Sequence, residues 1–172
     1  MSAAILFYAT GEVAHQLGPL FFAEKAIPLA IFGWITVAIF GLSFIGSRIS
    51  HILTDKFGDK NTILITIILL FFILIAATQL NGIIAGFVIA LGSLFWGIRQ
   101  PIISHYYHTL ATDKQRATII SIGQLANQLG LAIAAPIFGL IADIITVTQT
   151  FLIISLIYIP ILFLIRKLPK VV

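Results

Sequence analysis

The sequence contains no cysteine and few charged residues. The missing thiols exclude disulfide bonds, thiol catalysis and cysteine-ligated metal sites. Charged residues make up only 9% of the 172 residues and hydrophobic residues 60%, whereas soluble domains are roughly 25% charged. A chain of this size cannot hide so much apolar surface in its own interior. The sequence therefore predicts a protein embedded in lipid.

Sequence motifs of catalysis and nucleotide binding are also missing. The chain has no HExxH, no P-loop, no GxSxG and no dinucleotide fingerprint, so we expect neither an enzyme nor a cofactor. Its basic residues are scattered singly and form no patch, which argues against nucleic-acid binding. His105 and His108 lack a third ligand and flank two tyrosines, so we interpret them as interfacial residues rather than a metal site.

Apolar runs long enough to cross a bilayer, about 20 residues each, occur six times. Their long stretches of Leu, Ile and Phe favour helices over the alternating strands of a barrel. We therefore predict an all-α membrane protein in which residues 1–172 form one six-helix transmembrane domain. The predicted spans are 3–22, 28–53, 62–80, 82–104, 117–142 and 150–165.

The basic residues predict the orientation of these spans. One side of the membrane collects Lys and Arg from Arg48, the loops and the C-terminus, whereas the other side has only Lys25. Because cytoplasmic segments carry the excess of positive charge, we expect both termini to be cytoplasmic and the protein to lie in the cell membrane.

The chain also repeats itself with an offset of 88 residues, most informatively at Asp55 and Asp143. An offset of three spans predicts two triplets of opposite membrane orientation, a 3+3 inverted repeat. The third and sixth spans are almost uniformly apolar. We therefore expect those two helices at the lipid periphery and the other four around a polar inner face.

Residues Thr54 to Lys60 resemble the cytoplasmic loop signature of the major facilitator superfamily. Asp55, Lys56, Gly58 and Lys60 match it, while His51 and Asp59 depart from it. A second segment resembles the eleventh helix of that family, particularly in its drug-efflux branches. It comprises Arg116 to Thr118, Ser121, Pro136 and Gly139 to Asp143.

The resemblance covers the whole chain as helices seven to twelve, the C-terminal six-helix half of a major facilitator fold. It implies a secondary transporter for a small molecule, with efflux by antiport as the expected branch and proton coupling as an expected mechanism. Such a half requires a matching N-terminal half or a second copy of itself. The alternative is a six-helix membrane assembly or interaction protein without transport activity.

The candidate substrate or proton pathway begins in the first span. Tyr8, Glu12, His15 and Gln16 are spaced by three and four residues and share one helix face. Glu12 lies midway along the span, where a carboxylate is costly unless it is paired or hydrated. The residue is either a proton-coupling site or a structural hydrogen-bonding group.

The fourth and fifth spans supply the other pathway candidates. Arg99 and Gln100 lie near the end of the fourth span; Arg99 either contacts an anionic or gating partner or snorkels to the membrane surface. Gln124 and Asn127 belong to a polar stripe of the fifth span, which either lines a substrate path or joins helices.

The remaining candidates are structural. Thr112 and Gln115 fit a capping box at the start of the fifth span. Gly130 belongs to a small-residue face that permits close helix packing. Pro136, Gly139 and Asp143 follow in the same span. Asp55 is expected to accept hydrogen bonds at a helix start, and Gly58 to allow the turn beside it.

Overall fold

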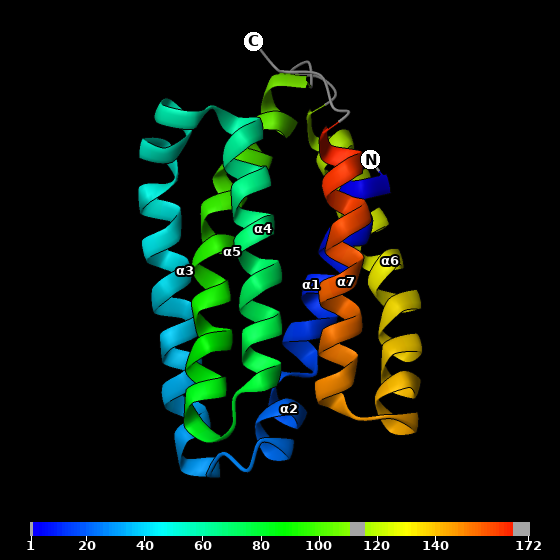
Figure 1. Cartoon of the computed structure of the whole chain (residues 1–172). Helices are drawn as coiled ribbons and strands as arrows, with labels where there is room; N and C mark the ends of the chain where they lie inside the picture. Colours follow the sequence, from blue (N-terminus) through cyan, green and yellow to red (C-terminus); the bar gives the residue numbers. More distant parts are fainter. Residues whose placement is uncertain (1, 111–115, 167–172) are drawn as a thin grey trace.

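The computed structural model describes residues 2–110 and 116–166, which form seven helices and no strands within those ranges (Figure 1). The all-α prediction is therefore confirmed. The helices are listed here in chain order: α1 Ser2–Gln16, α2 Gly18–Glu24, α3 Leu29–Phe57, α4 Asp59–Gln79, α5 Gly82–Leu110, α6 Arg116–Ile144 and α7 Val147–Arg166. Five of them, α3 to α7, are long and apolar enough to cross a membrane.

The first predicted span is not one helix but two. The break falls at Leu17, directly before Gly18 and Pro19. Proline has no N–H group to donate to the carbonyl of His15, so the helical hydrogen-bond ladder is interrupted there. With 15 residues, α1 is roughly 22 Å long, shorter than the about 30 Å of a hydrocarbon core. The short α2 continues its path.

The long helices run antiparallel to their chain neighbours, and turns join them at two ends of the bundle (Figure 1). One end carries the turns at Glu24, Asn81 and Thr146, and we call it the Glu24 end. The other carries the α3–α4 turn at Gly58, and we call it the Gly58 end. The α3–α4 connection is a single residue, Gly58, whose φ of 77° favours glycine. Gly58 therefore lies in the turn that the sequence analysis expected beside it.

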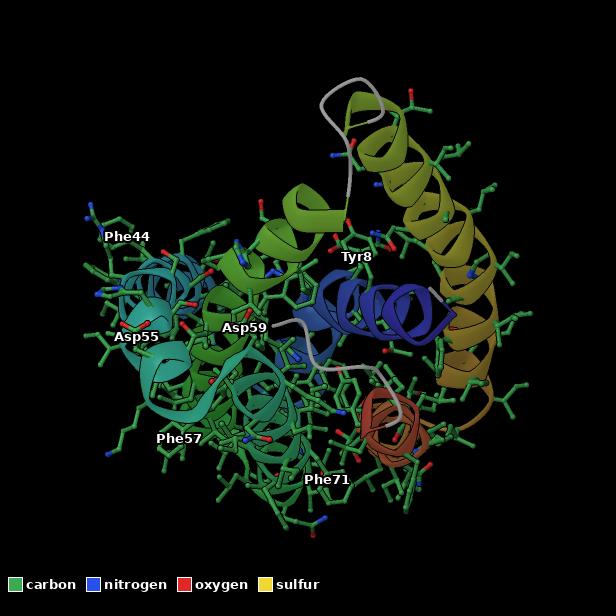
Figure 2. All side chains as sticks on the ribbon, turned by 90° about the horizontal axis from the view of Figure 1, so that it is seen from above. Tyr8, Phe44, Asp55, Phe57, Asp59 and Phe71 are labelled. Atoms are coloured by element: carbon green, nitrogen blue, oxygen red, sulfur yellow. The ribbon has the colours of Figure 1, made fainter. Side chains whose placement is uncertain are left out.

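The packing partners of the helices follow a regular pattern. Helix α5 packs on α3 and α4, whereas α1 packs on α6 and α7. Between these two groups, α4 packs against α7. Figure 2 shows α3 and α6 at opposite flanks of the bundle, with α1 and α5 between them.

The two flanking helices α3 and α6 expose more apolar surface than we expected. On α6 the exposed residues form one long row: Ile122, Leu125, Leu129, Ile133, Ile137, Leu140 and Ile144. Helices α4 and α7 pack together and bury one face, while the other face, including Leu69, Phe72 and Phe163, is exposed and apolar. A uniformly apolar helix can be surrounded by lipid or by other helices, because both surroundings are apolar. Its apolarity alone therefore does not show whether it lies at the periphery or in the centre of the bundle. That α4 and α7 face lipid stays a prediction.

The closest helix contact is between α3 and α5. A side chain at Gly46 would collide with the carbonyl of Leu94, and one at Gly97 with the carbonyl of Ser43. Two serine hydroxyls donate across the same contact, Ser50 to the Ile98 carbonyl at 2.7 Å and Ser93 to the Ile39 carbonyl at 2.8 Å. Small residues thus bring the two backbones together, as in many membrane helix pairs.

Candidate functional site

A buried polar cluster lies where α1, α5 and α7 meet. Thr10 of α1, Arg99 of α5 and Tyr158 of α7 are 0%, 1% and 1% exposed. The Tyr158 and Thr10 side chains are hydrogen-bonded, and Arg99 lies close enough to Tyr158 to interact with it electrostatically. The Arg99 Nε also donates to the Phe95 carbonyl at 3.1 Å. The snorkelling interpretation of Arg99 is therefore wrong, because its guanidinium is enclosed by helices and does not reach the surface.

Trp96 connects this cluster to the first helix. Its ring lies 5.5 Å from the Arg99 guanidinium carbon, a distance suited to a cation–π contact. The Tyr8 ring lies against the same indole, with centroids 6.0 Å apart and planes at 46°. Trp96 also packs on the α1 backbone, since a side chain at Gly11 would meet it at 2.9 Å. The structure thus links Tyr8 and Arg99, two predicted residues, through a tryptophan that the sequence analysis missed.

The other predicted pathway residues lie outside the buried cluster. Glu12 is partly buried and lies close enough to Tyr8 for electrostatic interaction. His15 and Gln16 follow it on α1 and are exposed. Gln100 of α5 and Gln124 of α6 are exposed as well, while Asn127 of α6 is partly buried. These residues lie on α1, α5 and α6, and polar side chains at an exposed surface of a membrane protein call for water or a partner rather than lipid.

The signature segment at the Gly58 end is mostly helical. Asp55 and Lys56 lie in the last turn of α3 and are exposed, and Lys60 lies in the first turn of α4. Helix α4 begins after Gly58, which has no side chain to cap it, and the expected capping role of Asp55 stays a prediction. Hydrogen bonds from α4 hold the turn instead, with Asn61 donating to the Phe57 carbonyl at 3.0 Å.

The predicted structural residues of α6 are distributed along the helix. Gly130 is partly buried, Pro136 lies exposed within the helix, and Asp143 is exposed in its last turn. A side chain at Gly139 would meet no atom within 4 Å, so this glycine is not required by packing among the described residues. The predicted capping residues, Thr112 and Gln115, lie outside the described residues.

A side-chain N-cap that the sequence analysis missed lies at the start of α7. The Gln149 N–H donates to the Thr146 hydroxyl at 3.1 Å. Thr146 and Gln149 have the same Thr-x-x-Gln spacing as Thr112 and Gln115, which the sequence analysis assigned to the fifth span. The Glu24 carboxylate caps this helix too, because the N–H groups of Val147 and Thr148 donate to it at 2.7 and 3.2 Å. These bonds explain why α7 begins three residues before the predicted span.

Lys25 fixes the neighbouring helix ends. Its ammonium group donates to the Thr78 carbonyl in the last turn of α4 at 2.8 Å, and its carbonyl accepts from the Gly82 N–H at the start of α5 at 3.2 Å. The Glu24–Lys25 turn therefore ties the ends of α4, α5 and α7 together. The sequence feature that could have indicated this role is an acidic and a basic residue, adjacent to each other in a short segment between two apolar spans.

The arrangement is that of an integral membrane protein with a polar cluster between its helices. Within residues 2–110 and 116–166, no group of three or more His, Cys, Asp or Glu side chains could hold a metal ion. Residues 1–171 match the model of the Major Facilitator Superfamily, so the chain belongs to that family. Among curated proteins, none matches the sequence. Family membership and the apolar helices fit a membrane transporter that resides in a lipid bilayer and acts on a small molecule.

Proposed function

We propose that the chain is the C-terminal six-helix half of a secondary transporter that exports a small molecule by alternating access. In this proposal α1 and α2 together form the first of six spans. The protein lies in the cell membrane, and both of its termini face the cytoplasm. The observation that carries the proposal is that polar side chains on α1, α5 and α6 are exposed, namely His15, Gln16, Gln100 and Gln124. Exposed polar groups inside a membrane need a hydrated surface.

The packing of the helices supports an inverted repeat. If α1–α2, α3 and α4 form one triplet and α5, α6 and α7 the other, the first helix of each triplet packs on the last two of its counterpart. Helix α6 begins 87 residues after α3, at 116 against 29, and α7 begins 88 residues after α4, at 147 against 59. Helices α3 and α6 are both 29 residues long. Both features favour the duplicated architecture of secondary transporters.

The exposed surfaces support an incomplete transport unit. The polar side chains of α1, α5 and α6 face no opposite wall within the described residues, and α3 and α6 expose apolar rows beside them. A second six-helix unit, either an N-terminal half or another copy of this chain, would cover the apolar rows and enclose the polar surface. A substrate site would then lie at the interface of the two units.

Within this transporter we assign proton coupling to Glu12. Its partial burial, its neighbour Tyr8 and His15 one turn away place a carboxyl group at the edge of the polar surface. Such a group can bind a proton from one side of the membrane and release it to the other. Arg99 and Tyr158, which are buried behind it, would keep α1, α5 and α7 in register.

Replacing Glu12 by Gln tests both coupling and transport. Gln keeps the shape and a hydrogen-bonding group but cannot release a proton. In the reconstituted two-unit transporter, Glu12→Gln is expected to abolish accumulation driven by a pH gradient while substrate exchange continues. Asp143→Asn, a matched change that removes an exposed carboxylate in the last turn of α6, should retain driven transport.

Two results would contradict this proposal at different levels. Full proton-driven transport by Glu12→Gln would make Glu12 a structural residue. If the chain moves no substrate either alone or with a matching half, the alternative of a non-transporting assembly protein is favoured.

A further inference from the structure

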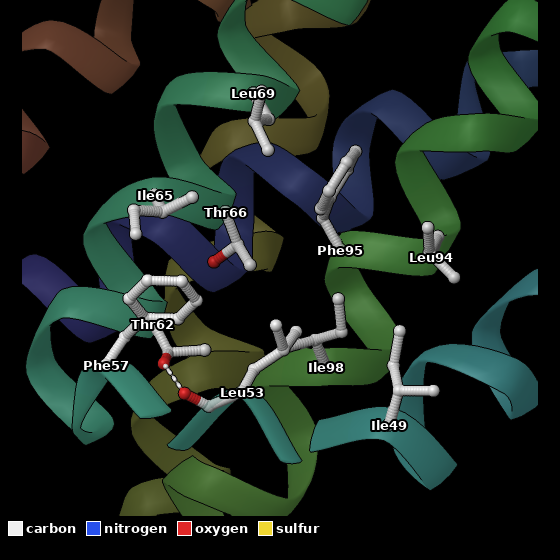
Figure 3. Close-up of a pocket in the computed structure, with 10 residues that line it drawn as sticks. All are labelled: Ile49, Leu53, Phe57, Thr62, Ile65, Thr66, Leu69, Leu94, Phe95 and Ile98. Carbon is white, nitrogen blue, oxygen red and sulfur yellow. Dashed lines mark hydrogen bonds between the residues drawn. The ribbon is translucent and has the colours of Figure 1, made fainter. Parts of the chain in front are cut away.

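An apolar groove lies between α3, α4 and α5 at the Gly58 end. It encloses about 250 Å³. Ile49, Leu53 and Phe57 of α3 form one wall, Ile65 and Leu69 of α4 the other, and Phe95 lies at its floor on α5 (Figure 3). The residues of the α3 wall are spaced by four and therefore follow one helix face. The groove arises because α3 and α4 each pack on α5 more closely than on one another.

The groove offers no hydrogen bond to an occupant. Its two threonines direct their hydroxyls to backbone carbonyls. Thr62 donates to the Leu53 carbonyl at 3.2 Å (Figure 3) and to the Gly58 carbonyl at 2.9 Å. Thr66 donates to the Ile63 carbonyl at 2.8 Å. The remaining wall is hydrocarbon, so the groove suits a hydrocarbon chain. From Thr62 to Leu69 it follows α4 for roughly 10 Å.

A positive charge lies at the mouth of this groove. The Lys56 ammonium is 5.3 Å from the centroid of the Phe57 ring, which lines the groove. An α-helix turns by about 100° per residue, so each residue of α3 has an angular position around the helix axis. Measured from the mean position of the three α3 residues that line the groove, Lys56 lies about 60° away, whereas Arg48 and Asp55 lie about 140° and 160° away. Asp59 is partly buried at the start of α4, and Figure 2 shows it on the inner side of the α3–α4 turn, with Phe57 at the outer edge.

We propose that this groove binds one acyl chain of an anionic phospholipid whose phosphate is held by Lys56. The lipid belongs to the leaflet that contacts the Gly58 end. Charge complementarity selects an anionic headgroup, because the Lys56 ammonium lies beside the Phe57 ring that lines the groove, while Asp55 lies on another face of α3. The apolar walls select the acyl chain. This lipid would fill the gap between α3 and α4 and so fix the single-residue turn at Gly58.

The headgroup is tested by native mass spectrometry on the full chain. The protein is purified from bilayers that contain equal amounts of phosphatidylglycerol and phosphatidylcholine with identical acyl chains, and the retained lipids are counted. The wild type should retain phosphatidylglycerol several-fold over phosphatidylcholine. Lys56→Gln should bring the ratio close to one, whereas Arg48→Gln, which removes an exposed cation on another face of α3, should preserve it.

The groove is tested by filling it. Ile65→Trp places an indole in the groove, while Ile52→Trp places one on α3 outside it. Both positions are exposed in the wild type, Ile65 at 42% and Ile52 at 57%. Ile65→Trp should lose the retained lipid and Ile52→Trp should keep it. Leu69→Phe fills the same groove by a smaller change if Ile65→Trp does not fold. Equal retention by the groove and control variants, or no preference for phosphatidylglycerol in the wild type, would overturn the proposal.

Discussion

Helix α5 has two different interfaces on its two sides. Toward α3 it presents small residues, Ser93 and Gly97, and the backbones touch. Toward α1 and α7 it presents large residues, Trp96 and Arg99, which reach a polar cluster. Close backbone contact leaves no space for rearrangement, because packed interiors resist deformation. Long side chains can change rotamers while remaining in contact.

The difference indicates where movement can occur. We expect α3 and α5 to move as one unit, because their backbones are in contact. The contacts through Trp96 and Arg99 join this pair to α1 and α7. If the two groups of helices shift during transport, we expect the change at the polar cluster and not at the small-residue contact. The predictions below test the two interfaces in order of expected effect.

The largest effect is expected at Gly97. Gly97→Ala adds a methyl group against the Ser43 carbonyl, and because the neighbour is backbone, it cannot move away cheaply. We expect a loss of about 3 kcal/mol or more in stability, near the upper range for overpacking, seen as a lower midpoint of thermal unfolding in detergent or as loss of folded protein.

Gly139→Ala provides the matched control for this change. Its methyl group meets no atom within 4 Å, and alanine favours helix over glycine by roughly 0.5–1 kcal/mol. It should leave the unfolding midpoint unchanged or raise it slightly. Equal midpoints for Gly97→Ala and Gly139→Ala would contradict the rigid α3–α5 contact.

A smaller effect is expected at the polar cluster. Tyr158→Phe removes the hydroxyl that is hydrogen-bonded to Thr10, and Thr10→Val removes the partner at similar volume. A double-mutant cycle on unfolding free energies should give a coupling of about 1 kcal/mol, the usual net contribution of a hydrogen bond. A coupling indistinguishable from zero would mean that α1 and α7 are held by packing alone.

Much of the fold follows from the sequence, because hydrophobic length and helix-breaking residues determine where spans begin and end. The second predicted span, 28–53, for example, begins one residue before α3 begins and ends four residues before α3 ends, and Gly58 lies in the turn that follows. The break in the first span was missed although Gly18 and Pro19 indicate it. Its apolar length is that of one span, and only the hydrogen-bond ladder distinguishes one helix from two.

The site was less predictable than the fold. Arg99 was a candidate by its charge, but its burial depends on side chains of α1 and α7, which are distant from α5 in sequence and reach Trp96 and Arg99 only in the folded bundle. Tyr158 and Trp96 lie in apolar runs where aromatic residues are common, so nothing in the local pattern singles them out. Glu24 lies between the first two predicted spans, and its capping of α7, 123 residues away, is a tertiary contact that the local sequence does not indicate.

Labelling of introduced cysteines tests most directly the central claim that α1, α5 and α6 line a hydrated surface. The sequence has no cysteine, so each introduced thiol is read without background. In bilayers, Gln16→Cys, Gln100→Cys and Gln124→Cys should react readily with a hydrophilic maleimide. Phe72→Cys and Phe163→Cys, at positions 60% and 63% exposed on α4 and α7, should react slowly because lipid covers them. Reaction of the glutamine positions as slow as that of the phenylalanine positions would contradict the account.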